Sequence, residues 1–161
     1  MASSGLALRI PPAVVCAIAI ELPYLYGSVP ANLNTLNIAF AACFALSGIV
    51  VGTLAILQFK AHQTTVDPRD PAQTSSLITS GIFRYSRNPI YLAMALLILA
   101  NGVALEDWGG LILALLFCVY IQYFQILPEE RALRQTFGDA FIRYSQRTRR
   151  WLGITTTDDA R

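Results

Sequence analysis

Residues 79–91 read Thr-Ser-Gly-Ile-Phe-Arg-Tyr-Ser-Arg-Asn-Pro-Ile-Tyr, and they place a polar, basic loop directly before an apolar run. Asn88 followed by Pro89 predicts a helix start, because Asn suits the N-cap and Pro at the first helical position lacks only an N–H that would be unpaired anyway. The free amides of such a start, with the helix dipole behind them, suit an anionic group. This stretch therefore predicts both a fold boundary and a ligand site, flanked by Arg84 and Arg87.

The rest of the chain is too apolar and too poor in charge for an ordinary soluble domain. Of its 161 residues 55% are hydrophobic and 14% are charged, and the mean hydropathy is +0.50. Four apolar segments, at about 10–29, 36–59, 89–105 and 109–127, each approach the ~20 residues that cross a bilayer core. We expect an all-α, polytopic membrane protein with about four transmembrane helices, forming a single domain over residues 1–161.

The distribution of charge predicts the topology of these helices. All 12 Lys and Arg residues lie on one side of a four-span arrangement, in the N-terminal segment, the loop 60–88 and the tail from 131 onward. The positive-inside rule then places both termini and the 60–88 loop in the cytoplasm. Because topology explains the basic residues and no recognised motif accompanies them, nucleic-acid binding is not expected.

The cysteines and the single histidine do not indicate a metal site. Cys16, Cys43 and Cys118 lie within apolar segments without ligand spacing, and His62 stands alone, so no metal is expected. Glu21 is the one acidic residue inside an apolar segment; such a carboxylate is a candidate functional group, but a position near the outer interface explains it better. Gly48 and Gly52 have the spacing that permits close helix packing.

The fourth apolar segment ends in polar residues that share one helical face. Gln122, Gln125 and Glu129 follow one another at steps of three and four residues, and a polar face on a membrane helix should point at protein or a cavity. Pro128 begins a helix or kinks one, which would put Glu129 and Glu130 in a first turn. Spacing alone leaves open whether these carboxylates stabilise the helix start or bind a ligand.

The C-terminal region has the pattern of an amphipathic helical tail. Apolar side chains recur at helical spacing among several arginines, which suits an anionic membrane surface; they are Leu133, Phe137, Phe141 and Tyr144. We expect the last residues, 155–161, to be disordered. The polar segment 60–80 leads directly into the helix start, so we expect it to be an ordered cytoplasmic wall beside the ligand site.

Two blocks of these residues resemble a known family. Residues 77–83 with 87–91 form the first block, and the second, after a helical hairpin, comprises Glu129-Glu130, Leu133, Phe137-Gly138 and Tyr144. Their order and spacing resemble the isoprenylcysteine carboxyl methyltransferase and phospholipid methyltransferase group of integral membrane enzymes. The resemblance covers about residues 60–150, and the first two apolar segments match only as helices.

The resemblance implies S-adenosylmethionine as the cofactor, held between the connecting loop, the last spans and the tail. Carried over by position, the implied cofactor contacts are Ser75, Ser76, Leu77, Ile78, Phe83, Asn88, Pro89, Ile90, Tyr91 and Glu129. We add Arg87 to the cofactor contacts because its guanidinium suits the carboxylate of the methionine moiety. Gln125 stands where the isoprenylcysteine enzymes have a substrate-contacting Arg. We assign Gln122 and Gln125 to substrate binding.

The position of Asn88 bears on the chemistry. The family often has His there, and an amide cannot titrate near neutral pH. We therefore expect no proton acceptor at this position, and methyl transfer from a sulfonium has no obligatory general base, so no catalytic residue is assigned.

Two functions follow as hypotheses. The first is an integral membrane S-adenosylmethionine-dependent methyltransferase acting on a small lipophilic or lipid-like acceptor among the membrane lipids, with oxygen, sulfur and nitrogen all open as the attacked atom. The second is a non-enzymatic four-helix membrane assembly or transporter subunit, for which Glu21 and the Gly48/Gly52 face are the main support.

Overall fold

The computed structural model describes residues 10–27, 34–62 and 76–155, and within these ranges every regular element is helical. The elements are α1 (Pro12–Leu25), α2 (Thr35–Ala61), the short 3-10 helix η2 (Gly81–Arg84), α3 (Pro89–Ala104), α4 (Trp108–Ile121), the π-helical turn η3 (Gln122–Ile126), α5 (Leu127–Phe137) and α6 (Asp139–Arg147). Most of the loop 60–80, including Ser75, and the terminal residues 156–161 lie outside the described residues. The expectations of an ordered wall over 60–80 and of terminal disorder thus stay largely outside the description.

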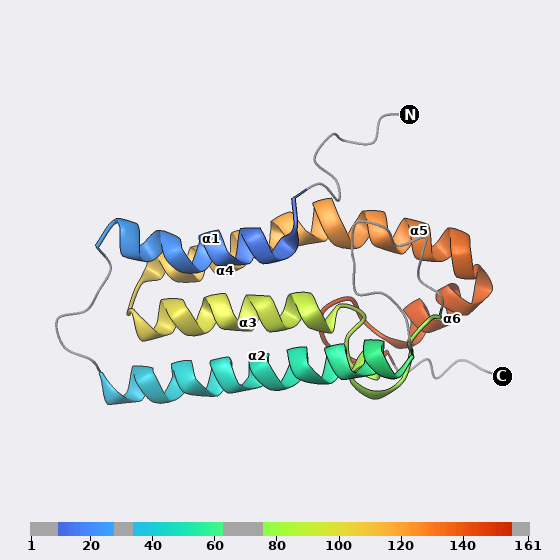
Figure 1. Ribbon diagram of the computed structural model, residues 1–161, viewed down its shortest axis with the longest axis horizontal. Helices are drawn as coiled ribbons and strands as arrows, with labels where there is room; N and C mark the ends of the chain where they lie inside the picture. Colours follow the sequence, from blue (N-terminus) through green and yellow to red (C-terminus); the bar gives the residue numbers. More distant parts are fainter. Residues whose placement is uncertain (1–9, 28–33, 63–75, 156–161) are drawn as a thin grey trace.

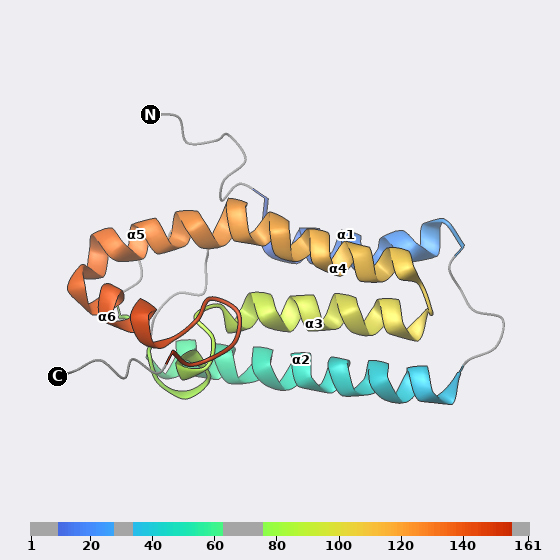
Figure 2. The ribbon, with the colours of Figure 1, turned by 180° about the vertical axis from the view of Figure 1, so that it is seen from behind.

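Four helices run side by side along the long axis, with α3 between α2 on one side and α1 and α4 on the other (Figures 1 and 2). We call the end where α2 finishes and α3 begins the basal end, and the opposite end the distal end. The helix of α4 continues through η3 into α5, which extends beyond the start of α3 (Figure 1). At Gly138, whose φ is +50°, the chain turns back into α6.

Two of the helices are long and apolar enough by themselves to cross a membrane. They are Thr35–Ala61 and the continuous helix Trp108–Phe137. The apolar helices α1 and α3 have 14 and 16 residues, or about 21 and 24 Å at 1.5 Å per residue. The prediction of an all-helical apolar protein is confirmed within the described residues, and two of the four predicted spans meet the length requirement. The first predicted segment, 10–29, is helical only as far as Leu25.

Glycines bring α3 close to both of its long neighbours. A Cβ added at Gly48 would lie 3.0 Å from the Ala93 carbonyl oxygen, and one at Gly52 would lie 3.3 Å from the Ala93 Cβ. The predicted packing role of Gly48 and Gly52 is therefore confirmed. On the other side of α3, a Cβ at Gly110 would lie 2.7 Å from the Gly102 Cα, so the α3–α4 hairpin also depends on small residues.

The basal end has an apolar cluster of its own. It joins the end of α2, the loop before α3 and the last two helices, and its buried members are Ala55, Ile78, Phe83, Phe141 and Tyr144. Leu133 and Phe137 pack against this cluster. The apolar face of the tail, which the sequence assigned to a membrane surface, is therefore packed on the protein.

Candidate ligand site

The loop before α3 is held by hydrogen bonds to the C-terminal segment. The Arg87 N–H donates to the Arg149 carbonyl at 3.0 Å, and the Ser86 hydroxyl donates to the Arg150 carbonyl at 3.3 Å. The helix begins at Pro89, as predicted, but the Asn88 side chain makes no capping hydrogen bond. Its amide donates instead to the Arg150 carbonyl at 3.0 Å, while the Asn88 N–H donates to the Ser86 hydroxyl oxygen. The polar side chains of this loop therefore fix residues 149–150.

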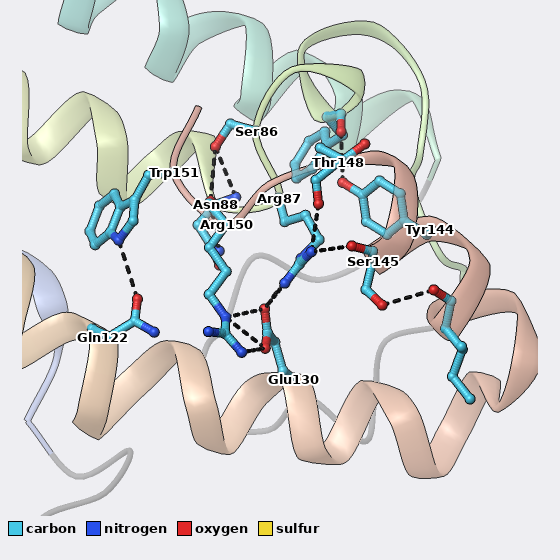
Figure 3. Close-up of polar contacts among 12 residues, drawn as sticks. Ser86, Arg87, Asn88, Gln122, Glu130, Tyr144, Ser145, Thr148, Arg150 and Trp151 are labelled. Carbon is cyan, nitrogen blue, oxygen red and sulfur yellow. Dashed lines mark hydrogen bonds and ion pairs between the residues drawn. The ribbon is translucent and has the colours of Figure 1, made fainter. Parts of the chain in front are cut away.

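Glu130 lies between two arginines from distant parts of the chain (Figure 3). Its Oε1 is 2.5 Å from Arg87 Nη2, and its Oε2 is 2.8 Å from Arg150 Nη2. The side chains of Arg87 and Glu130 are only 10% and 14% exposed. A carboxylate with two guanidinium partners is held in its charged form, and these hydrogen bonds are charge-assisted. The trio joins α5, the loop before α3 and the C-terminal segment.

Arg87 also binds the end of α6. Its Nη1 donates to the Ser145 carbonyl at 2.8 Å and to the Thr148 carbonyl at 2.5 Å. Together with the bonds to Glu130, the planar guanidinium serves three separate acceptors, an arrangement for which Arg is suited and Lys is not. Arg87, which the sequence analysis assigned to the cofactor, is thus already hydrogen-bonded to protein groups in the described structure.

Residues 148–155 form a segment that we call the C-terminal strap. It folds on itself through an antiparallel bridge between Thr148 and Ile154, and the Gly153 N–H donates to the Tyr85 carbonyl at 2.8 Å. The Thr148 hydroxyl donates to the Arg84 carbonyl at 3.2 Å. The strap is therefore bonded along its length to the loop before α3.

Tyr91 and Glu129 meet beside the first turn of α3. The Tyr91 hydroxyl donates to Glu129 Oε1. Tyr91 belongs to the buried cluster between α1, α3 and α4, which also contains Ile121 and Ile126. The contact joins the two sequence blocks that carried the family resemblance.

The two glutamines lie in the π-helical turn immediately before Glu129. Gln122 Oε1, in the side-chain amide, accepts a hydrogen bond from Trp151 Nε1 at 3.2 Å (Figure 3). Gln125 is fully buried; its amide donates to the Ile10 carbonyl at 3.0 Å, and its Oε1 has no hydrogen-bond partner among the described residues. Buried, unpaired acceptors are uncommon and call for a reason, and π-helical turns are frequent at functional sites.

The structure brings most of the predicted site residues to the basal end, in two groups. Ile78 and Phe83 are buried in the basal cluster, with Leu77 and Ile90 packed against it. Tyr91 belongs to the buried cluster between α1, α3 and α4, which we call the bundle cluster. Gln122 and Gln125 lie in η3 and Glu129 lies in the first turn of α5, midway along the continuous helix Trp108–Phe137. The Ser76 hydroxyl oxygen is buried without a partner among the described residues. Their roles as ligand contacts stay predictions.

Three residues of this region were missed as site components: Ser86, Arg150 and Trp151. Glu130 was considered with Glu129, and its role was left open. The adjacent Arg149, Arg150 and Trp151 carried the available signal, since a Trp beside two arginines near the end of a basic tail suggests docking as readily as a membrane surface. Helical spacing favoured Glu129 because it falls on the face of Gln122 and Gln125. Only the tertiary contacts identify the partner of Glu130.

Arg150, a member of the trio, and the nearby Tyr144 are both held in their protonated forms. Burial raises the pKa of the Tyr144 phenol, against the opposing effect of the Arg87 charge. The phenol therefore donates to the Phe83 carbonyl, at 2.7 Å. Hydrogen bonds to Glu130 raise the pKa of Arg150. Tyr144 and Arg150 therefore stay hydrogen-bond donors at physiological pH.

An open apolar groove lies further along α3, toward the distal end. Its volume is about 420 Å³, and its lining includes Ile20 of α1, Ala41 and Ala45 of α2, and Leu97 and Asn101 of α3. None of the predicted site residues lines it. The apolar lining suits hydrocarbon chains.

Comparison with known proteins identifies the family. The family model described as phospholipid methyltransferase matches residues 36–140. A protein of Haemophilus influenzae named "Uncharacterized protein" is 41% identical over 66 residues, which cover 39% of this chain and the whole of that protein. No solved structure matches the chain.

Proposed function

Since the chain belongs to the phospholipid methyltransferase family, we propose that it is an integral membrane methyltransferase that uses S-adenosylmethionine and acts on a small lipophilic or lipid-like acceptor. The observation that carries the proposal is the contact of Tyr91 with Glu129. It joins the two sequence blocks at one end of an apolar helical bundle. Glu129 follows Gln125 by four residues, and the buried Oε1 of Gln125 has no hydrogen-bond partner among the described residues.

The proposed topology has four membrane segments, with both termini and the 60–88 loop in the cytoplasm. The one-sided distribution of Lys and Arg supports it. The shorter helices α1 and α3 would cross with the help of flanking residues or local thinning of the bilayer. A membrane-impermeant thiol reagent tests this topology: in sealed inside-out vesicles it should label a cysteine placed at His62, and protection of that cysteine would reverse the proposed orientation.

The donor and acceptor groups at the site fit this cofactor. S-adenosylmethionine carries an ammonium and ribose hydroxyls, all of which are hydrogen-bond donors. The Glu129 carboxylate and the buried Gln125 Oε1 are acceptors, and the latter lacks a partner among the described residues. Glu129, Tyr91 and Gln125 would bind these donors, which moves Gln125 from the substrate role predicted from the sequence to the cofactor. The amides at the start of α3 suit the carboxylate of the methionine moiety.

When bound, S-adenosylmethionine would supply an electrophilic methyl group: the acceptor nucleophile would form a bond to the methyl carbon while the S–CH3 bond opposite it breaks and S-adenosylhomocysteine leaves. The contribution of the protein is to position the reactants and exclude water, so a dedicated base is not obligatory. The apolar surroundings of Tyr91, among Ile98, Phe117, Ile121 and Ile126, suit the exclusion of water. Lipophilic acceptors would enter this region from the bilayer.

Calorimetric titration of S-adenosylmethionine into the detergent-purified protein tests the proposal. We expect saturable binding that Glu129→Ala and Tyr91→Ala each weaken about tenfold or more, because each removes a partly buried hydrogen-bonding group. Glu21→Gln is the matched control, since Glu21 is exposed on α1. No binding at millimolar cofactor would refute the cofactor assignment, and unchanged affinity in both alanine variants would refute the site.

A further inference from the structure

The C-terminal strap is fixed on both sides of Trp151. On one side, the backbone carbonyl of Arg150 accepts hydrogen bonds from the side chains of Ser86 and Asn88. The guanidinium of Arg150 binds Glu130 through Nε and Nη2. On the other side, Gly153 is bonded to Tyr85. The backbone around Trp151 therefore has little freedom, and its indole has a defined position.

That position is next to the candidate ligand site. The indole packs against the bundle cluster that contains Tyr91, Ile121 and Ile126. Its Nε1 bonds to Gln122. The same π-helical turn contains Gln125, whose buried Oε1 has no hydrogen-bond partner in the part of the chain that the structure describes. Figure 3 shows the indole directed away from the strap toward Gln122. The neighbouring Leu152, in contrast, is 65% exposed.

We propose that the C-terminal strap is part of the ligand site: Trp151 contacts the bound cofactor, and Glu130 is a positioning residue that holds Trp151 there through Arg87 and Arg150. The identity of the ligand rests on the proposed function. An indole face attracts cations, and the sulfonium and ammonium of S-adenosylmethionine are both cationic. Glu130 is a positioning residue because its described ion pairs are with the two arginines.

The expected consequence is energetic coupling between Glu130 and Trp151. Replacing Glu130 by Gln leaves two partly buried guanidinium groups without their carboxylate, which favours release of the strap. If Glu130 acts through the indole, its substitution should matter much less once Trp151 is replaced. A residue that merely stabilises the fold would have the same effect on cofactor affinity in either background.

Trp151 supplies a direct readout. The chain has two tryptophans, and Trp108 is 79% exposed at the start of α4, so Trp108→Phe leaves Trp151 as the single reporter. In that background, saturating cofactor should change the emission of Trp151, and Glu130→Gln should shift the emission of the cofactor-free protein to longer wavelength. Leu152→Ala, an exposed change within the strap, is the matched control and should alter neither.

The deciding experiment is a double-mutant cycle on cofactor affinity in the full-length, detergent-purified chain. We expect Glu130→Gln and Trp151→Leu each to weaken cofactor binding about tenfold or more. The Kd of the double variant should exceed that of Trp151→Leu alone by at most about threefold. Arg150→Gln, at a 41% exposed side chain, should reproduce the effect of Glu130→Gln if the latter variant fails to fold. The role of the strap would be overturned if the two substitutions multiplied their effects on the Kd. It would also be overturned if cofactor binding left Trp151 emission unchanged and Trp151→Leu bound as tightly as the wild type. In both cases the methyltransferase proposal stands. Absence of cofactor binding by the wild type would refute the proposed function itself. Unshifted emission of cofactor-free Glu130→Gln would refute the positioning of Trp151 by Glu130, whether or not the cofactor binds.

Discussion

At the scale of single residues, the basal end divides its charged groups into two sets. Arg87, Glu130 and Arg150 bind one another and the backbone, so they hold the structure together. Glu129 contacts Tyr91, a neutral partner, which leaves carboxylate acceptor capacity for a ligand. Adjacent glutamates thus have different partners, and we expect different consequences when each is replaced.

Arg87→Lys should destabilise the folded protein although it conserves charge. A lysine ammonium cannot reach Glu130 and the carbonyls of Ser145 and Thr148 with one planar fork, so we expect a loss of about 1–3 kcal/mol in the free energy of unfolding. Chemical unfolding in mixed micelles measures this quantity. Arg84→Lys, at an exposed side chain in the same loop, is the control and should lie within about 0.5 kcal/mol of the wild type. Equal losses in the two variants would contradict the specific role of Arg87.

At the scale of helices, the bundle depends on close backbone approach where α3 meets α4. Gly102 and Gly110 face each other across the hairpin, and a Cβ at Gly110 would meet backbone atoms that cannot move independently. At Gly52 an added Cβ would meet only the Ala93 side chain, at 3.3 Å. The two glycines therefore differ in what a methyl group would displace.

Gly110→Ala should lower the thermal midpoint of unfolding, and Gly52→Ala should leave it nearly unchanged. Alanine is the better helix former by about 1 kcal/mol, so a loss at Gly110 would report the clash rather than a propensity effect. Thermal scans of both variants in the same detergent give the comparison. A midpoint for Gly110→Ala at or above that of the wild type would show that α3 and α4 are packed less closely than described.

The helices show which features were predictable from the sequence. The Asn88-Pro89 pair predicted the start of α3 because helix starts depend on local backbone chemistry. The Gly48/Gly52 spacing predicted close packing for a similarly local reason. The π-helical turn at 122–126 had no such signal, since a single turn of five residues is too short to show a periodicity of its own.

The candidate site was predicted less completely, because its missing members depend on contacts between distant segments. The partner of Glu130 lies 43 residues away at Arg87 and 20 residues away at Arg150. The Asn88 side chain was expected to cap α3, but it binds the Arg150 carbonyl because the strap passes beside it. Helical periodicity identifies a face of one element and cannot identify which segment covers that face.

At the scale of the whole molecule, the chain combines an apolar bundle with a polar basal end. Exposed apolar side chains, among them Leu46, Ile49, Val50 and Leu57, cover α2, as expected for a helix in contact with lipid. At the basal end, Tyr91 of α3 bonds to Glu129 of α5. The strap is joined to the same long helix by Trp151, which bonds to Gln122, and by Arg150, which pairs with Glu130. This arrangement would let a lipophilic acceptor and a water-soluble cofactor reach one site from different sides.

The central claim is that this end of the bundle transfers a methyl group to a lipophilic acceptor. The most direct measurement is transfer of radiolabelled methyl from S-adenosylmethionine to solvent-extractable products, by the purified protein supplied in turn with lipophilic acids, thiols and amino-lipids. We predict label in the organic phase for at least one acceptor class, reduced about tenfold or more by Glu129→Ala and unchanged by Glu21→Gln. Organic-phase label at background level for all three classes, or equal transfer by the wild type and Glu129→Ala, would contradict the account.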